Sequence, residues 1–385
     1  MTDSTIPPAD TPVPEQQSLG PIAAAKRIEV MDILRGFALI GIVLMNIEWF
    51  SRSSTELGSF DRSLTGIDHA AGWLIRCFVE GKFYKLFALL FGMGFAVMLL
   101  RAQEVGRPFG AWFTRRMLAL FVFGLIHFVF IWNGDILHDY AFGGLMFLLW
   151  IYAFRTRRLQ RFNNPRTFLK IGLVWLLLPA FVASLAGMVY SVRTDNTDFE
   201  AAWKTDQEVA VIVDEQLAEP VPEDYDFDDD ATDEEDVDEA ELSDEERKEL
   251  RIERTVRSER RSDKKASDET AILSEGSYLE ATKHRLSKLP QALGQTPPMT
   301  ILILIPIFLV GYWFIASGVL KSHREHHTLF RSMAWIGLTA GFSTSVGGLL
   351  IMQHPAAQTS RSLLAVGGTL FFLSQYLLSA GYLGM

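Results

Sequence analysis

Long apolar segments dominate this sequence and constrain its fold more than any other feature. Eight segments reach about 18 residues, roughly the length that crosses the hydrocarbon core of a bilayer. Helices of a soluble domain would carry polar faces, and these segments carry almost none. They lie near 33–50, 83–100, 112–132, 136–154, 168–190, 299–320, 332–352 and 362–383. The sequence therefore predicts an all-α, polytopic transmembrane bundle of about eight spans.

Acidic residues are concentrated in one long polar insertion at 193–298. Within it, 223–246 contains 16 acidic residues out of 24 and no basic residue. Such a block repels itself and cannot bury a core, so we expect the insertion to be largely disordered there. Ser243 and Glu246 have the spacing of a capping box, which predicts a basic helix directly after the acidic run.

These features divide the chain into four parts. Residues 1–25 lack a positively charged start and are rich in Pro, Ser and Thr, which predicts a disordered tail, not a cleaved signal peptide. We expect five spans in 26–192, the insertion at 193–298, and three further spans in 299–385.

Basic residues in the short connections predict the orientation of the chain. If the N-terminus is cytoplasmic, 15 Lys and Arg residues lie on the inner side and six on the outer side. We therefore expect a multi-pass protein of a bacterial inner membrane, with both termini cytoplasmic and the insertion outside. The lipid bilayer is its expected partner, and we expect no nucleic acid.

Asp32 and Arg35 stand at the start of the first apolar segment, three residues apart. On a helix they can neutralise each other. Because unpaired charges are costly at membrane depth, the pair has reason to face a cavity or ligand. Alternatively, Arg35 extends toward lipid headgroups as an anchor. Asn46 and Glu48 lie near the far end of the same segment, which favours a functional role.

Several stretches together resemble one protein family. They are RIEVMDILRGFALIGIVLMNI, EGKFYKLFALLFGMGFAVML, RRMLALFVFGLIHFVFIWNGDILHDYAFGG, GSYLEATKHRLSKLP and PIFLVGYWFIASGVL. They resemble the YeiB-like family of bacterial inner-membrane proteins, catalogued as a domain of unknown function. That family is distantly similar to transmembrane acyltransferases. The resemblance implies transfer of an acyl group from a cytoplasmic donor such as acyl-CoA to an extracytoplasmic acceptor. No other cofactor is expected.

The resemblance also suggests site residues. In many such acyltransferases an arginine early in the first helix is followed, after ten residues, by a catalytic histidine. Here Arg35 is followed at that spacing by Asn46, whose amide cannot act as a base near neutral pH. We therefore expect Asp32, Arg35 and Asn46 to contact substrate. By analogy with a branch that uses a later histidine, His69 is a candidate base.

A second candidate is the GDILHDYA stretch, where Asp135 and His138 would share one face of a helix. Asp135 could instead be a helix cap, with His138 merely interfacial. We expect His127, inside an apolar segment, to be buried and satisfied by a neighbouring helix. His323, His326 and His327 belong to a basic loop. No third ligand with defined spacing indicates a metal site.

Two other functions fit the same features. Charges at both ends of glycine-containing spans suit a small-molecule transporter, and the acidic insertion suits a non-catalytic membrane scaffold. Chains similar to this one usually continue with further helices, so we expect this chain to be either a short variant or an incomplete chain.

Overall fold

The computed structural model describes residues 28–51, 65–154, 164–193, 199–222, 225, 227, 242–354 and 361–385. Within these ranges the regular structure is helical and contains no strand. The expectation of an all-α fold is therefore confirmed. The N-terminal tail and most of the acidic run lie outside the described residues.

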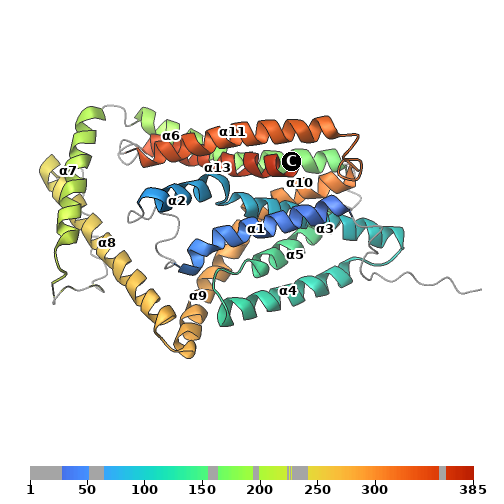
Figure 1. Cartoon of the computed structure of the whole chain (residues 1–385), viewed down its shortest axis with the longest axis horizontal. Helices are drawn as coiled ribbons and strands as arrows, with labels where there is room; N and C mark the ends of the chain where they lie inside the picture. Colours follow the sequence, from blue (N-terminus) through green and yellow to red (C-terminus); the bar gives the residue numbers. More distant parts are fainter. Residues whose placement is uncertain are drawn as a thin grey trace, which may run out of the picture.

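Most of the helices form one elongated bundle, and two further helices lie beyond one end of it (Figure 1). The helices before the insertion are α1 (Glu29–Ser51), α2 (Gly66–Phe78), α3 (Lys82–Glu104), α4 (Gly110–Phe130), α5 (Leu137–Phe154) and α6 (Pro165–Arg193). The insertion contains α7 (Phe199–Ala218), α8 (Asp244–Ser274) and α9 (Tyr278–Met299). A π-helical turn, Thr300–Leu304, then leads into α10 (Ile305–Ala316), α11 (His327–Gln353) and α13 (Arg361–Gly384).

Six helical stretches of the described chain are long and apolar enough to cross a membrane. They are Glu29–Glu48, Gly66–Glu104, Gly110–Phe130, Tyr278–Ala316, His327–Gln353 and Leu363–Gly384. Each overlaps one of the eight predicted segments. The other two predicted segments coincide with α5 and α6, which are helical but not among these six. The count of about eight spans is therefore approximate.

Helix α3 is the centre of the bundle and packs against α1, α10 and α13. Glycines allow its closest approach to α10. A Cβ atom on Gly92 would lie 2.5 Å from the backbone oxygen of Phe308, and one on Gly311 would meet the oxygen of Leu89. The two helices are therefore in close contact at Gly92, where only a residue without a side chain fits.

Two buried lysines join the start of α3 to α2 and α13. The Lys82 ammonium is fully buried and donates a 2.5 Å hydrogen bond to the carbonyl oxygen of Arg76, in the last turn of α2. Lys85 donates to Gln375 on α13. Lys82 and Lys85 are two of the six Lys and Arg residues on the predicted outer side. Because they are buried within the bundle, the outer side has fewer loop cations than expected.

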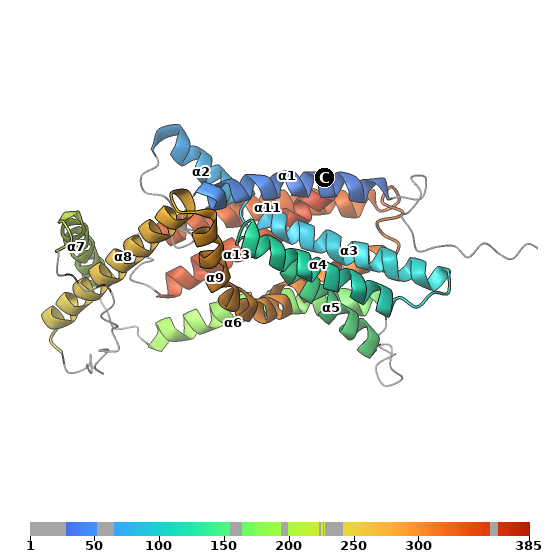
Figure 2. The same cartoon turned by 90° about the horizontal axis from the view of Figure 1, so that it is seen from below.

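The described part of the insertion is more ordered than its composition suggested. The expected capping box is present, with Ser243 and Glu246 exchanging hydrogen bonds at the start of α8. Helices α7 and α8 share a small apolar contact made by Val209, Val213, Ile252 and Val256. Figure 2 shows these two helices projecting from the bundle, while α9 returns toward α4.

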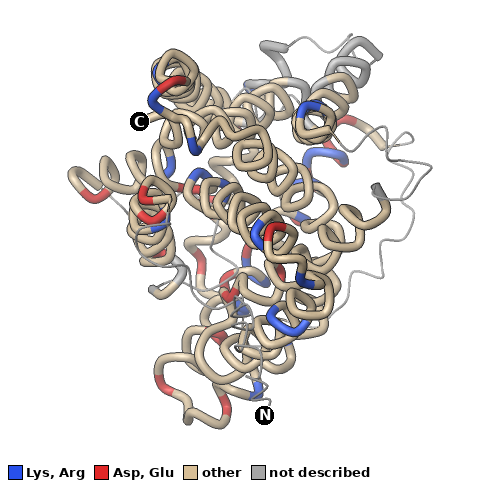
Figure 3. The backbone as a smooth tube through the Cα atoms, turned by 90° about the vertical axis from the view of Figure 1, so that its right-hand side faces the viewer, with Lys and Arg blue, Asp and Glu red and all other residues tan. Residues whose placement is uncertain are grey.

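The bundle has two distinct ends. We call one the cationic end; it is formed by the starts of α1 and α4 and by the ends of α3 and α10. Figure 3 views the molecule from this side. We call the opposite end, where α7, α8 and α9 attach, the insertion end (Figure 1). Helices α1 and α4 both run from the cationic end to the insertion end.

Candidate functional site

Asp32 and Arg35 form the expected pair at the cationic end. Arg35 Nη1 donates a 2.9 Å hydrogen bond to Asp32 Oδ1, and the two side chains are 43% and 49% exposed. The exposed guanidinium therefore keeps donors available for another group. The Arg35 guanidinium can bind either a ligand or a lipid headgroup in this geometry. The surroundings of Arg35 decide which of the two it suits.

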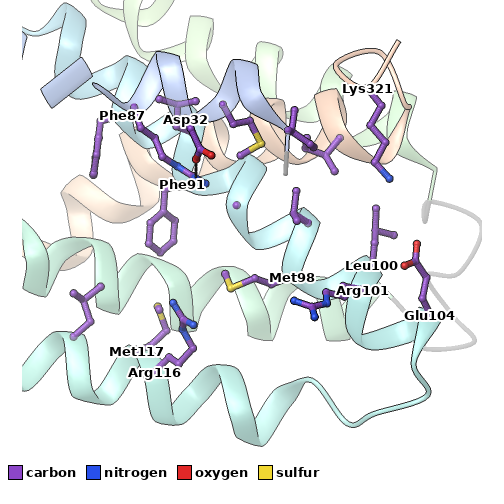
Figure 4. A pocket seen from close by; sticks show the side chains of 18 of the residues that line it. Asp32, Phe87, Phe91, Met98, Leu100, Arg101, Glu104, Arg116, Met117 and Lys321 are labelled. Atoms are coloured by element: carbon purple, nitrogen blue, oxygen red, sulfur yellow. Dashed lines mark hydrogen bonds and ion pairs between the residues drawn. The ribbon is translucent and has the colours of Figure 1, made fainter. Parts of the chain in front are cut away.

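Those surroundings are a cavity of about 1160 Å³ between α1, α3 and α4. Arg35, Arg101, Arg116 and Lys321 line it, and Asp32 and Glu104 are the carboxylates beside them. In Figure 4 Arg116 reaches in from one side and Lys321 from the other, with Arg101 between them. Three arginines from α1, α3 and α4 and a lysine from the connection after α10 thus meet two acidic side chains, leaving an excess of positive charge.

The rest of the cavity wall is apolar. Phe87, Phe91, Met98, Leu120 and Phe123 extend it from the cations toward the middle of the bundle. A ligand that fits such a wall has an anionic end, for the cations, and a longer, less polar body. Guanidinium groups are well suited to phosphate, because they offer planar, paired donors. A phosphate-bearing amphiphile is therefore the ligand class that this cavity suits.

A buried polar cluster lies around the start of α5, toward the insertion end. Asp135 accepts backbone hydrogen bonds from Leu137 (2.7 Å) and His138 (3.3 Å), so it caps α5 as the sequence suggested. Thr296 of α9 donates a 2.5 Å hydrogen bond to Asp139. The tight packing of α4 here depends on Gly124, where a Cβ atom would lie 2.5 Å from the amide nitrogen of His138.

His138 is held on both sides by carboxylates. Its Nδ1 lies 3.3 Å from Asp135 Oδ1, and its Nε2 lies 3.5 Å from Asp139 Oδ1. The side chain is only 3% exposed. Since both ring nitrogens face acidic groups, neither remains to take a proton from a substrate. The geometry therefore favours a structural role for His138.

His127 is the second histidine that contacts Asp135. Its Nδ1 lies 2.8 Å from Asp135 Oδ2, although the contact is not aligned as a hydrogen bond. Such contacts are often poorly aligned before substrate binds. The imidazole is 34% exposed while Nδ1 itself is buried, so the exposed surface belongs to the rest of the ring. Asp135 therefore faces Nδ1, and Nε2 is the nitrogen on the other side of the ring.

The other two candidate residues, Asn46 and His69, lie apart from the Asp135 carboxylate. Asn46 is one turn before Phe50 on the same face of α1, and the Phe50 ring packs against Trp132, 4.7 Å between centroids. Trp132 in turn lies 6.4 Å from the His127 ring. Asn46 is therefore on the side of α1 that approaches His127. His69 is exposed on the first turn of α2, and Asp135 contacts His127 and His138 instead.

Sequence reasoning missed His127 and Arg116 as site residues. Asp135 is the last residue of the turn WNGD (132–135), which folds α5 back against α4 and brings Asp135 beside His127. Arg116 is one of the 15 Lys and Arg residues on the predicted inner side. A signal was present, because Arg116 and His127 are separated by ten residues, the spacing that Arg35 and Asn46 also show.

Curated relatives match part of the chain. It is 38% identical to the uncharacterised protein YxaH of Bacillus subtilis (strain 168) over 185 residues, which are 46% of this chain and 42% of YxaH. It is 27% identical to the uncharacterised protein YeiB of Escherichia coli (strain K12) over 183 residues, 47% of this chain and 42% of YeiB. The chain is a homologue of the YeiB-like proteins. An uncharacterised 39.9 kDa protein in the amylase 3′ region of Bacillus acidopullulyticus is 41% identical over 130 residues, 34% of this chain and 36% of that protein.

The chain thus spans less than half the length of these curated relatives. No family model matches the chain, so the expected domain of unknown function is not confirmed. No solved structure matches it either. The membrane-length helices indicate a membrane protein, and part of the chain is homologous to YxaH and YeiB. The identity of its membrane and the side of its termini stay predictions.

Proposed function

We propose that this chain is a membrane acyltransferase that binds an acyl-CoA-type donor in the cationic cavity and uses His127 as its base. The observation that carries the proposal is the placement of Arg116 and His127 on one helix. Arg116 lines the cavity, and His127 contacts Asp135 further along α4. Helix α4 therefore connects Arg116, at the anion-binding end, with His127, the proposed base.

The separation of these two residues suits a donor with a long arm. Eleven residues of α-helix rise about 16 Å. A donor held by its phosphates at Arg35, Arg101 and Arg116 would need an extended chain to bring its thioester to His127. The phosphopantetheine arm of acyl-CoA is a chain of that kind. The apolar wall made by Phe91, Leu120 and Phe123 lies between the two positions and would line its path.

The spacing between Arg116 and His127 is the one that the family resemblance implies, but it occurs on a different helix. In the acyltransferases the arginine and the histidine are separated by ten residues in the first helix, whereas here they lie in α4. Helix α1 runs in the same direction with Arg35 and Asn46. Asn46 would then hydrogen-bond substrate near His127 and have no part in proton transfer.

The reaction follows from this arrangement. His127 Nε2 takes the proton from an acceptor hydroxyl or amine as that oxygen or nitrogen attacks the thioester carbonyl. The carbon–sulfur bond then breaks, and the CoA thiolate takes the proton from His127. Asp135 beside Nδ1 stabilises the imidazolium that forms between these steps. The acceptor receives the acyl group, and no oxidant or metal is required.

The test uses membrane vesicles that contain the full chain and its natural acceptor. Wild type should release free CoA thiol from acyl-CoA, and Arg35→Lys and Arg116→Lys should each raise KM for the donor, because an ammonium lacks the paired donors of guanidinium. Arg107→Lys, outside the cavity, is the matched control. If acyl-CoA binds without thiol release, or if solute flux alone depends on these arginines, the enzyme proposal fails and the transporter is favoured.

A further inference from the structure

Helix α4 ends at Phe130, so His127 lies in its last turn, and that turn needs partners. A helix leaves its final carbonyl oxygens without intrahelical donors. The carbonyl of His127 accepts from the amides of Ile131 (2.9 Å) and Trp132 (2.8 Å), which closes the turn around the histidine. The carbonyls of Val129 and Phe130 follow it and find no such donor in the turn.

Both of those carbonyls are bound by α9, the last helix of the insertion. Arg285 Nε donates a 2.8 Å hydrogen bond to the oxygen of Val129, and the Tyr278 hydroxyl donates one of 2.8 Å to the oxygen of Phe130. Arg285 is only 8% exposed. A buried cation at the C-terminal end of α4 also opposes the negative end of the helix dipole.

The position of α9 is itself fixed from two sides. A capping box between Ser277 and Glu280 starts the helix at Tyr278. At its far end, Thr296 donates to Asp139 in the polar cluster. Between them, His284 lies 3.4 Å from Glu269 of α8. Helix α9 therefore connects the projecting part of the insertion with both helices that carry the polar cluster.

We infer that Arg285 is a positioning residue, which holds the last turn of α4 so that His127 stays beside Asp135. The inference rests on the proposed function, because His127 matters there as the base. It makes the insertion a part of the site, since the residue that orders the base belongs to the insertion. Without Arg285, the Val129 carbonyl loses its donor, the last turn frays, and the imidazole moves away from Asp135.

The experiment measures the reactivity of His127 as well as activity. In full-length protein reconstituted in nanodiscs, diethylpyrocarbonate labelling of His127 is followed by peptide mass spectrometry. Arg285→Ala should raise the labelling rate severalfold and lower kcat with KM for acyl-CoA unchanged, because the donor cations lie at the other end of α4. Arg285→Lys should restore part of the protection, since an ammonium can still bond Val129. Lys283→Ala, an exposed cation of the same helix, should leave both measurements at wild-type values.

Two results would overturn the inference. One is an Arg285→Ala protein that unfolds at lower temperature but labels at the wild-type rate, which would make Arg285 a purely structural contact. If that variant does not fold, Tyr278→Phe provides the second test, because it removes the hydrogen bond to the Phe130 oxygen. A wild-type labelling rate of His127 in Tyr278→Phe would also make the contact between α9 and α4 purely structural. Altered labelling without any acyl transfer in wild type would refute the proposed function and leave the positioning role standing.

Discussion

Thr296 and Asp139, 157 residues apart in the sequence, meet in a 2.5 Å hydrogen bond inside the bundle. Thr296 is 3% exposed and precedes Pro297 and Pro298, where α9 gives way to the π-helical turn. Prolines lack the amide donor that a regular α-helix uses, which accounts for a break at this point. The hydroxyl of Thr296 thus fixes the break against the polar cluster.

Removing that hydroxyl should cost stability. Thr296→Val keeps the shape of the side chain and leaves Asp139 buried without its donor, which should cost about 1–3 kcal/mol and lower Tm. Thr344→Val is the control, because the hydroxyl of Thr344 bonds carbonyls of its own helix. Equal Tm values for the two variants, measured in the same detergent, would show that the bond to Asp139 contributes nothing.

The contact between α3 and α10 should not tolerate a methyl group. Gly92→Ala places a Cβ atom 2.5 Å from the Phe308 oxygen, so the helices must separate and Tm should fall. Gly347→Ala has no atom within 4 Å of its new Cβ, and alanine favours the helix there by about 1 kcal/mol. A Gly92→Ala protein as stable as Gly347→Ala would show that this approach is not tight.

Orientation can be tested with one exposed position on α8. Ser258→Cys, in a chain whose buried Cys77 is replaced by serine, should react with a membrane-impermeant maleimide in intact cells. The reason is the excess of Lys and Arg in the connections predicted to be cytoplasmic. Labelling that requires permeabilised cells would reverse the orientation and place the insertion in the cytoplasm.

The packing of α7 against α8 should depend on pH. Lys248 donates a 2.8 Å hydrogen bond to Glu208, which lowers the pKa of that carboxyl from its ordinary value of 4.5. A carboxyl with a lowered folded pKa stabilises the contact above pH 4.5 and loses that contribution as pH falls through the lowered value. Hydrogen exchange in α7 should therefore increase below about pH 4.5, and Glu208→Gln should remove the dependence.

The sequence was sufficient for the architecture because each membrane helix carries its own signal. Apolar runs of membrane length predict spans, and each of the six membrane-length stretches of the described chain overlaps one of those runs. Helices α7 and α9 were not foreseen. Their composition is polar, and their order comes from contacts with α8 and α4 that periodicity does not report.

The site was only half predictable for a related reason. Arg35 with Asp32, and Asp135 with His138, are neighbours within one helix, so their spacing reveals them. His127 meets Asp135 only after a turn reverses the chain, and Arg116 meets Arg35 only because α1 and α4 run parallel beside one cavity. Such pairings depend on tertiary structure.

The central claim is that His127, held beside Asp135, is the base, and that His138 is structural. The most direct measurement compares CoA thiol release by His127→Gln and His138→Gln at matched membrane levels, together with Tm for each. We predict that His127→Gln lowers kcat about 100-fold or more at nearly unchanged Tm. We predict that His138→Gln lowers Tm and retains more activity per folded molecule. The opposite pattern, with turnover lost in His138→Gln and kept in His127→Gln, would contradict the account.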